Sequence, residues 1–286
     1  MKRTTILLVA LASLFAAAPL LAHPSVTVVM DARGNVFYSD LARVWKISPD
    51  GRKSVAVEAV HAHELFLDGQ GNLYGEHLWY EGEKTDRWRH RVWRRSRDGA
   101  VTDVYPARPG FRTDYSFVRD ATGSMYWVER GTPTLFRKRA PDGAVSTVVE
   151  CPRCSDVRWM TVTPDGTLEF VDGRDLYEIS PAGAIRLRAR ALGRPTLLRP
   201  HAGGHHVVMG LWTDGARNVY AAVYGTGEVK RVAPDGRVTV VARSTLPWSP
   251  TGGMIGPDGS LWILEYSITN AVRVRRIDPS GRVTVF

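Results

Sequence analysis

The sequence predicts an all-β fold, a six-bladed β-propeller of four-stranded antiparallel blades. Three observations support this prediction: two turn signatures alternate along the chain, aromatic and β-branched runs separate them, and no helix-period stretch follows the first 22 residues. The founding unit runs from Asp31 to Gly51. In it, Gly34-Asn35 and Pro49-Asp50-Gly51 suit tight turns, because glycine tolerates positive φ and proline presets a corner.

Both turns recur through the chain. The first is repeated at Gly71-Asn72, Gly123-Ser124, Gly166-Thr167, Arg217-Asn218 and Gly259-Ser260. The second is repeated at Asp98-Gly99, Pro141-Asp142-Gly143, Pro181-Ala182-Gly183, Pro234-Asp235-Gly236 and Pro279-Ser280-Gly281. First turns are spaced 37, 52, 43, 51 and 42 residues apart. Four strands with their turns need roughly 40–50 residues, the period of a propeller blade.

Each blade is expected to place an inner strand before the first turn and an outer strand after the second. Blade 1 supplies Val26–Met30, Val36–Tyr38, Val44–Ile47 and Ser54–Val57. Blade 6 supplies Met254–Ile255, Leu261–Leu264, Val272–Ile277 and Val283–Phe286. Because every blade is complete in chain order, we expect packing between neighbours, without an exchanged strand, to close the ring.

Residues 1–22 are typical of a cleavable signal peptide, with Lys2 and Arg3 before an apolar run and Leu20-Leu21-Ala22 at the cleavage site. The alternative is an uncleaved anchor. Residues 23–286 then form one propeller domain, and we expect a periplasmic or secreted monomer without a membrane span. The formal charge of +9 would favour nucleic acid inside a cell. For an exported protein, the charge favours anionic small molecules or an exported partner protein instead.

The densest basic segment, 87–97, interleaves arginine with tryptophan. Such a pattern occurs in nucleic-acid grooves. It also fits a strand with arginines facing solvent and tryptophans packed behind, which is the interpretation we favour.

Two insertions identify the face that carries function. Blade 2 has an excess at Trp79–His90, and the link from blade 4 to blade 5 has one near Arg190–His206. Strand alternation places both on the face opposite the turn signatures. Loops longer than their structural minimum often carry function, so we expect the site there.

Histidines and acids converge on this face. An acid recurs six residues after the first-turn glycine, as Asp40, Glu129, Asp172 and Glu265, while blade 2 has Glu76-His77. A carboxylate there can cap backbone N–H groups, which is the interpretation favoured for Asp40 and Asp172.

Six of the eight histidines lie on these segments, at positions 61, 63, 77, 201, 205 and 206. Imidazole and carboxylate together can hold a divalent metal or transfer protons near neutral pH. We therefore predict His63, Glu64, His205 and His206 as ligands of a divalent metal of unknown identity. His77, Glu76 and Glu265 are predicted as catalytic, although a solvated loop would equally explain His205-His206.

Further residues complete the prediction. Tyr115, Arg158 and Trp159 begin inner strands and are expected, with Glu129, to bind substrate at the mouth; core packing is the alternative for both aromatics. Cys151 and Cys154 are expected to form a small-loop disulfide in an oxidising compartment, with metal ligation as the alternative.

The repeats resemble those of six-bladed propellers of the NHL-repeat and senescence-marker/gluconolactonase type. Blade 6, from Gly256 to Glu265, also resembles a repeat of the streptogramin lyases. The gluconolactonase resemblance implies a divalent cation held by a Glu, Asn and Asp set, with His63-Glu64 near the Glu position. Trp159-Met160 and Met209-Gly210 stand where asparagines would be expected. The lyase resemblance implies histidine and glutamate at the mouth, as His77, His205 and Glu265 could provide.

Together these observations predict an exported propeller that hydrolyses a small molecule, as a lactonase does, or cleaves it as a lyase, in its central funnel. The alternative is a non-catalytic propeller that binds a protein, peptide or glycan.

Overall fold

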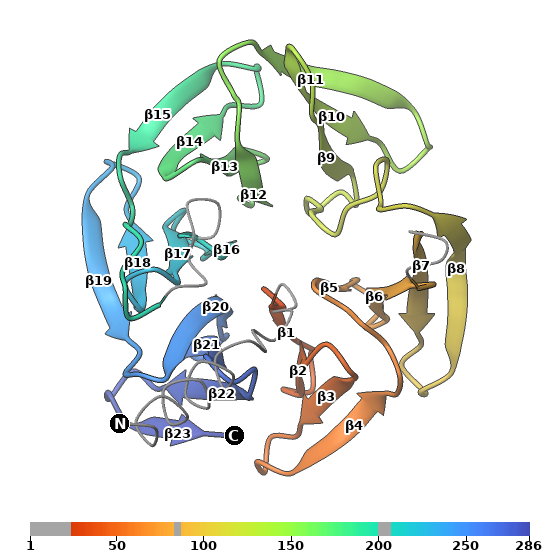
Figure 1. Ribbon diagram of the computed structural model, residues 1–286, viewed down its shortest axis with the longest axis vertical. Coiled ribbons are helices and arrows are strands. Elements are labelled where there is room, and N and C mark those ends of the chain that lie inside the picture. The colour runs from red at the N-terminus through yellow and green to blue at the C-terminus, as the bar shows by residue number, and fades with distance from the viewer. Residues whose placement is uncertain (1–23, 83–86, 200–206) are drawn as a thin grey trace, which may run out of the picture.

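Six antiparallel sheets stand around a central axis in the computed structural model (Figure 1). The structure describes residues 24–82, 87–199 and 207–286. The chain runs once round the ring, so that the blade built from β1–β4 lies beside the blade built from β20–β23 (Figure 1). The chain is therefore a six-bladed β-propeller, as the repeats predict.

The strands follow one another from the axis outward in each blade (Figure 1). Those of blades 1 to 3 are β1 (Val28–Met30), β2 (Val36–Ser39), β3 (Val44–Ile47), β4 (Lys53–Val57), β5 (Leu65–Leu67), β6 (Leu73–Tyr80), β7 (Trp88–Arg95), β8 (Val101–Pro109), β9 (Met125–Glu129), β10 (Thr134–Arg139) and β11 (Val145–Cys151). Those of blades 4 to 6 are β12 (Val157–Val162), β13 (Leu168–Asp172), β14 (Asp175–Ile179), β15 (Ile185–Ala189), β16 (Gly210–Thr213), β17 (Val219–Val223), β18 (Glu228–Val232), β19 (Val238–Arg243), β20 (Trp248–Ile255), β21 (Leu261–Ser267), β22 (Val272–Ile277) and β23 (Val283–Val285).

The repeated turns have the backbone conformation that their residues predict. Gly34 has φ of 78° and donates its N–H to the Asp31 carbonyl at 2.9 Å, and Gly51 has φ of 85°. The first turn of blade 5 has Arg217 at the glycine position, and it too adopts a positive φ, of 61°. The turn geometry is thus kept even where a side chain makes it less favourable.

Blade 3 departs from the regular pattern, because its sheet contains three strands, β9 to β11. Its inner segment meets β9 through the Arg119–Met125 bridge, the hydrogen bond from the Tyr126 N–H to the Val118 carbonyl, and a hydrogen bond from the Ser116 N–H to Met125 Sδ. The segment before this bridge is therefore irregular where it approaches the axis, and this segment contributes to the site.

Apolar side chains fill the spaces between blades. Trp93 of β7, which is fully buried, packs with Val44 of blade 1. Burial of a side chain this large contributes about 2–3 kcal/mol. Between the last and first blades, Trp262 and Leu264 pack against Val28.

The ring closes without an exchanged strand, as the sequence predicts. All four described strands of blade 6 come from the C-terminal part of the chain. Contacts across this junction include a parallel bridge between Thr27 and Gly253 and a hydrogen bond from the Tyr266 hydroxyl to the Ser39 carbonyl.

Blade 2 carries the longest hairpin on the face that the insertions identify. Strands β6 and β7 pair over eight positions each, up to Tyr80 opposite Trp88. Trp93 of the basic segment packs inward, whereas Trp88 stays exposed, so the predicted division between arginine and tryptophan faces holds only in part. The second insertion continues into residues 200–206, which lie outside the described chain.

Across the described ranges, the structure contains no helix with the length and apolar character that a membrane crossing requires.

Candidate functional site

A cavity of about 210 Å³ opens between blades 2, 3 and 4 near the axis. Its polar wall is formed by Glu64, Arg112, Arg130 and Arg158, and its flat walls by Tyr115, Trp127 and Trp159. A second cavity of about 150 Å³, lined by inner strands of blades 1 to 5, shares Glu64, Val118, Trp159 and Met160 with the first. The two hollows therefore adjoin, and Glu64 borders both.

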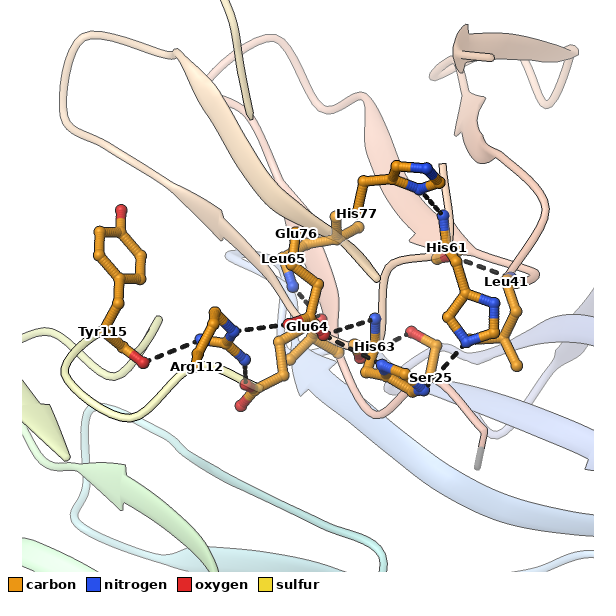
Figure 2. Close-up of polar contacts among 12 residues, drawn as sticks. Ser25, Leu41, His61, His63, Glu64, Leu65, Glu76, His77, Arg112 and Tyr115 are labelled. Atoms are coloured by element: carbon orange, nitrogen blue, oxygen red, sulfur yellow. Dashed lines mark hydrogen bonds and ion pairs between the residues drawn. The ribbon is translucent and has the colours of Figure 1, made fainter. Parts of the chain in front are cut away.

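Arg112 links two carboxylates from different segments of blade 2 (Figure 2). Its Nη2 donates to Glu64 Oε2 at 2.8 Å and its Nε donates to Glu76 Oε2 at 2.5 Å. Its Nη1 donates to the Tyr115 carbonyl at 3.0 Å. A guanidinium carries five N–H donors, so three are used and two can serve a ligand in the cavity that Arg112 lines.

Glu76 lies beneath the cavity wall, with its side chain only 6% exposed. Besides Arg112, it accepts hydrogen bonds from the His63 backbone N–H at 3.3 Å and from His63 Nδ1 at 3.0 Å. Burial would raise the pKa of Glu76, but the Arg112 charge and the hydrogen bond from His63 outweigh it, so the pKa lies well below its ordinary value. Glu76 is therefore ionised at neutral pH.

Arg112 is held in its charged form by the same pair. Burial alone would lower the pKa of its guanidinium, but the charges of Glu76 and Glu64 raise it. The result is one cation shared by two carboxylates, with Glu64 on the side of the cavity.

Two more histidines extend the network away from the cavity. His61 Nε2 lies 3.2 Å from His63 Nε2, and the His61 backbone N–H donates to His77 Nδ1 at 2.9 Å (Figure 2). Burial, followed by the proximity of His63, lowers the pKa of His61 to about 4. Burial and then the Arg91 charge lower the pKa of His77. Both rings are therefore neutral at pH 7.

The local sequence explains how the network is positioned. Gly75 precedes Glu76 in β6, and a Cβ on it would lie 2.2 Å from the Trp93 indole. The missing side chain lets the indole lie against β6, where Trp93 Nε1 donates to the Glu76 carbonyl at 2.8 Å. The other side of the site is fixed by the His63 carbonyl, which accepts hydrogen bonds from the Val26 N–H and the Ser25 hydroxyl.

Three of the four predicted substrate-binding residues, Tyr115, Arg158 and Trp159, line the cavity. Arg158 Nε donates to Asp156 Oδ1 at 2.5 Å, and Trp159 Nε1 donates to the Val208 carbonyl at 2.6 Å. Glu129 does not itself line the cavity, but it accepts a hydrogen bond at 3.3 Å from Nε1 of Trp127, which does, and it pairs with Arg137 at 3.5 Å.

Glu265, predicted as catalytic, is placed elsewhere. It is fully buried in β21, within 2.6 Å of Arg273 Nε and 2.9 Å of Arg275 Nη2, and it accepts a hydrogen bond from the Ser244 hydroxyl. Its described partners are Arg273, Arg275 and Ser244, and it lines neither cavity. Its two arginine partners and complete burial indicate a structural role between blades 5 and 6.

The recurring acids Asp40 and Asp172 cap backbone groups, as the repeat predicts. Asp40 accepts from the backbone N–H groups of Ala42 and Arg43, both at 2.9 Å. Asp172 accepts from the Asp156 N–H at 2.6 Å.

The predicted metal ligands separate into two sets. His63 and Glu64 belong to the network, whereas His205 and His206 lie outside the described residues. Within the described part of the chain, no group of three or more His, Cys, Asp or Glu side chains is arranged to hold a metal. The Arg112 guanidinium already pairs with both carboxylates, at 2.8 Å from Glu64 and 2.5 Å from Glu76, so a divalent cation would have to displace it, and the described donors do not fit such an ion.

Cys151 and Cys154 form a disulfide at the end of β11. The adjacent Thr134 hydroxyl donates to the Cys154 carbonyl at 2.9 Å, which fixes the loop to β10.

Arg112 was not singled out by sequence reasoning, although it joins the site's carboxylates. It is one of 38 lysines and arginines, and it lies in the link between blades 2 and 3, outside both insertions. The one available signal was indirect: two acids close to the axis require a cationic partner.

The fold and this cavity define the class: a six-bladed propeller with a buried charge network at the axial end of blade 2. No protein-family model matches the chain, and no curated protein matches its sequence.

Solved structures with this fold include lyase and gluconolactonase-type propellers. A catalytically inactive histidine-to-alanine variant of virginiamycin B lyase from Staphylococcus aureus, with quinupristin, is 15% identical, with a TM-score of 0.53 over 91% of this chain and 82% of that one. A putative gluconolactonase is 17% identical, with a TM-score of 0.58 over 91% and 89%. Regucalcin from Agrobacterium tumefaciens, described as a calcium-binding protein, is 18% identical, with a TM-score of 0.54 over 85% and 82%.

Proposed function

We propose that this propeller is an enzyme that cleaves an ester or lactone bond in a small anionic molecule, by hydrolysis or by elimination. The observation that carries the proposal is the Glu64–Arg112–Glu76–His63 network at the wall of the cavity. Structures with the same fold include a lyase and a putative gluconolactonase, which agrees with this proposal.

Glu64 is the proton acceptor in this proposal. It is the one carboxylate among the described residues that line the two cavities. In hydrolysis it would accept a proton from the water that attacks the carbonyl carbon, and the alcohol oxygen would leave with a proton. In elimination it would accept a proton from the carbon adjacent to the one that bears the ester oxygen, so that a C=C bond forms and the carboxylate leaves. General acid–base groups of this kind contribute about 10²–10⁴-fold to rate.

Arg112 supplies the matching positive charge. Its two remaining N–H donors can stabilise the negative charge that develops on the carbonyl oxygen, because the guanidinium is already held in place beside the cavity. Glu76 positions the guanidinium by accepting from its Nε, and His63 holds Glu76 in turn through Nδ1. Arg130 and Arg158 add positive charge to the wall, which favours an anionic substrate.

The experiment combines a substrate panel with solvent labelling. Small lactones and carboxylate-bearing esters are incubated with the protein in H₂¹⁸O, and products are identified by mass spectrometry. Hydrolysis incorporates ¹⁸O into the product acid, whereas elimination forms a double bond without solvent oxygen.

Glu64→Gln keeps the shape and hydrogen-bonding capacity of the side chain but removes the base. We expect kcat/KM to fall by about 10²–10³-fold, with a small change in Tm. Glu58→Gln, a change at a side chain that is 70% exposed, is the matched control and should leave the rate unchanged. A Glu64→Gln variant with the wild-type rate would contradict the proposal.

The second candidate function is binding without chemistry, to a protein, peptide or glycan. The observation that favours binding is that Glu76 already pairs with Arg112 and with His63, so neither Glu76 nor His63 has to take part in a reaction. If no member of the panel is converted and a ligand raises the Tm of the wild type and of Glu64→Gln equally, this candidate is supported instead.

The proposed enzyme acts outside the cytoplasm as a monomer. The Cys151–Cys154 disulfide supports this location, because disulfides persist in oxidising compartments. Cell fractionation with the mass of the mature protein tests it: a periplasmic or secreted chain lacking residues 1–22 is expected, and a cytoplasmic full-length chain would contradict it.

A further inference from the structure

Three aromatic rings are exposed together beside the cavity. Tyr80 at the end of β6, Trp88 at the start of β7 and Phe111 in the link to blade 3 are 39%, 38% and 58% exposed. The Tyr80 and Trp88 ring centroids are 5.1 Å apart, and those of Trp88 and Phe111, which stack at 29°, are 5.4 Å apart. We call Tyr80, Trp88 and Phe111 the aromatic platform.

The backbone fixes the platform in place. Tyr80 and Trp88 are directly opposite in the β6–β7 ladder. The Gly110 N–H donates to the Trp88 carbonyl at 2.6 Å, and His90 Nδ1 lies 2.7 Å from the Gly110 carbonyl. Phe111 is therefore held against Trp88 before any ligand arrives.

The platform is continuous with the cavity. Phe111 and Arg112 are consecutive, so their Cα atoms are about 3.8 Å apart. The Phe111 ring is exposed, and the Arg112 side chain lines the cavity. Tyr115, three residues after Arg112, also lines the cavity, and its ring centroid lies 5.7 Å from that of Tyr105. The platform and the cavity therefore adjoin along residues 111–115.

The size of the platform indicates what it binds. A stable protein interface buries about 800 Å² on each partner, far more than three rings offer. Stacking of aromatic rings adds about 0.5–1.5 kcal/mol beyond burial, and it requires a flat partner. The cross-strand pair Tyr80–Trp88 also stabilises the hairpin, but that role does not require Phe111 to remain exposed.

We infer that the aromatic platform is a ligand subsite that stacks on an aromatic ring of the substrate, while the anionic group of the same molecule lies at the arginine-lined cavity. This inference rests on the proposed function for its anionic group, but the stacking subsite is tested by itself. The ligand class is an aromatic carboxylate.

The test uses 1-naphthylacetate and the non-aromatic cyclohexylacetate as probes, with affinity measured by calorimetry on the full-length protein. We expect the wild type to bind naphthylacetate more tightly, and Trp88→Ala and Phe111→Ala each to weaken it by about three- to tenfold. Cyclohexylacetate should bind all variants equally. Ile268→Ala, which removes an exposed apolar side chain in blade 6, is the matched control and should bind as the wild type does.

Phe111 lies outside the strands, so its variant guards against a folding defect in Trp88→Ala. The inference is overturned if naphthylacetate does not bind, if it binds both variants as tightly as wild type, or if both probes lose affinity equally. Failure of the proposed function gives a different result. The esters and lactones of the substrate panel are then not converted, while naphthylacetate still binds and still loses affinity in the Trp88→Ala and Phe111→Ala variants.

Discussion

Blade 2 and blade 6 each bury a glutamate near the end of their second strand: Glu76 lies five residues after its first-turn glycine and Glu265 six residues after its own. Each glutamate forms an ion pair with arginine. The arginines of Glu265 come from β22, the next strand of its own sheet, and its surroundings are closed. The partner of Glu76 comes from the link to blade 3 and also binds Glu64, which faces a cavity. A buried ion pair therefore does not by itself mark a site; the second carboxylate facing open space does.

The largest effect is expected at Glu265. Glu265→Gln leaves Arg273 and Arg275 without their anion in a buried place, which should cost about 3–5 kcal/mol of unfolding free energy. Urea unfolding measures it. Glu129→Gln, at the same repeat position but 43% exposed, should cost less than about 1 kcal/mol. Equal losses in both variants would remove the contrast between buried and exposed members of the repeat.

The next effect is expected at Arg112. Arg112→Met removes the shared cation and should cost about 2–3 kcal/mol at pH 7, because Glu76 stays buried without its main partner. Arg91→Met, which removes an ion pair with Asp103 at the surface, is the control and should cost little.

The pH dependence sharpens the Arg112 prediction. In the wild type, the lowered pKa of Glu76 gives stability that is present above its ordinary value of 4.5 and lost as pH falls. In Arg112→Met, burial dominates and raises that pKa, so the variant should lose stability as pH rises through this range. Parallel pH profiles of the two proteins in urea unfolding would contradict the role given to Arg112.

The smallest effect is expected at His61, whose ring is neutral when folded. Its pKa is lowered from 6.5 to about 4, so the unfolded chain binds the proton first as pH falls. Stability should be intact above pH 6.5 and decrease by on the order of 2 kcal/mol toward pH 4. His61→Gln keeps the backbone N–H that binds His77 but should lose this part of the pH dependence. An unchanged profile would contradict the lowered pKa, because it would show that His61 binds its proton equally well in the folded and unfolded chain.

The repeat made the fold predictable because its turns are local. A glycine with positive φ and a neighbouring proline determine their own few residues, whatever surrounds them. Even the Arg217 turn was located, by its place in the series. The turn pattern does not predict that the inner strand of blade 3 is reduced to the Arg119–Met125 bridge, because the conformation of this inner segment depends on its contacts near the axis.

The site was predicted in part, for a related reason. The segment His61 to Glu64 and the pair Glu76-His77 were found because they interrupt the repeat, and the structure joins them. Arg112 and the surroundings of Glu265 depend on which side chains neighbouring segments bring near. No spacing along the chain encodes that proximity.

The closure of the ring without an exchanged strand has a consequence for how such a chain can be assembled. The first and last blades meet through side chains and one bridge, as a joint between two separate surfaces would. The choice of which blade comes first in the chain then matters little energetically: a chain opened at another turn, with blade 6 linked to blade 1, would keep the same neighbours and the same set of joints.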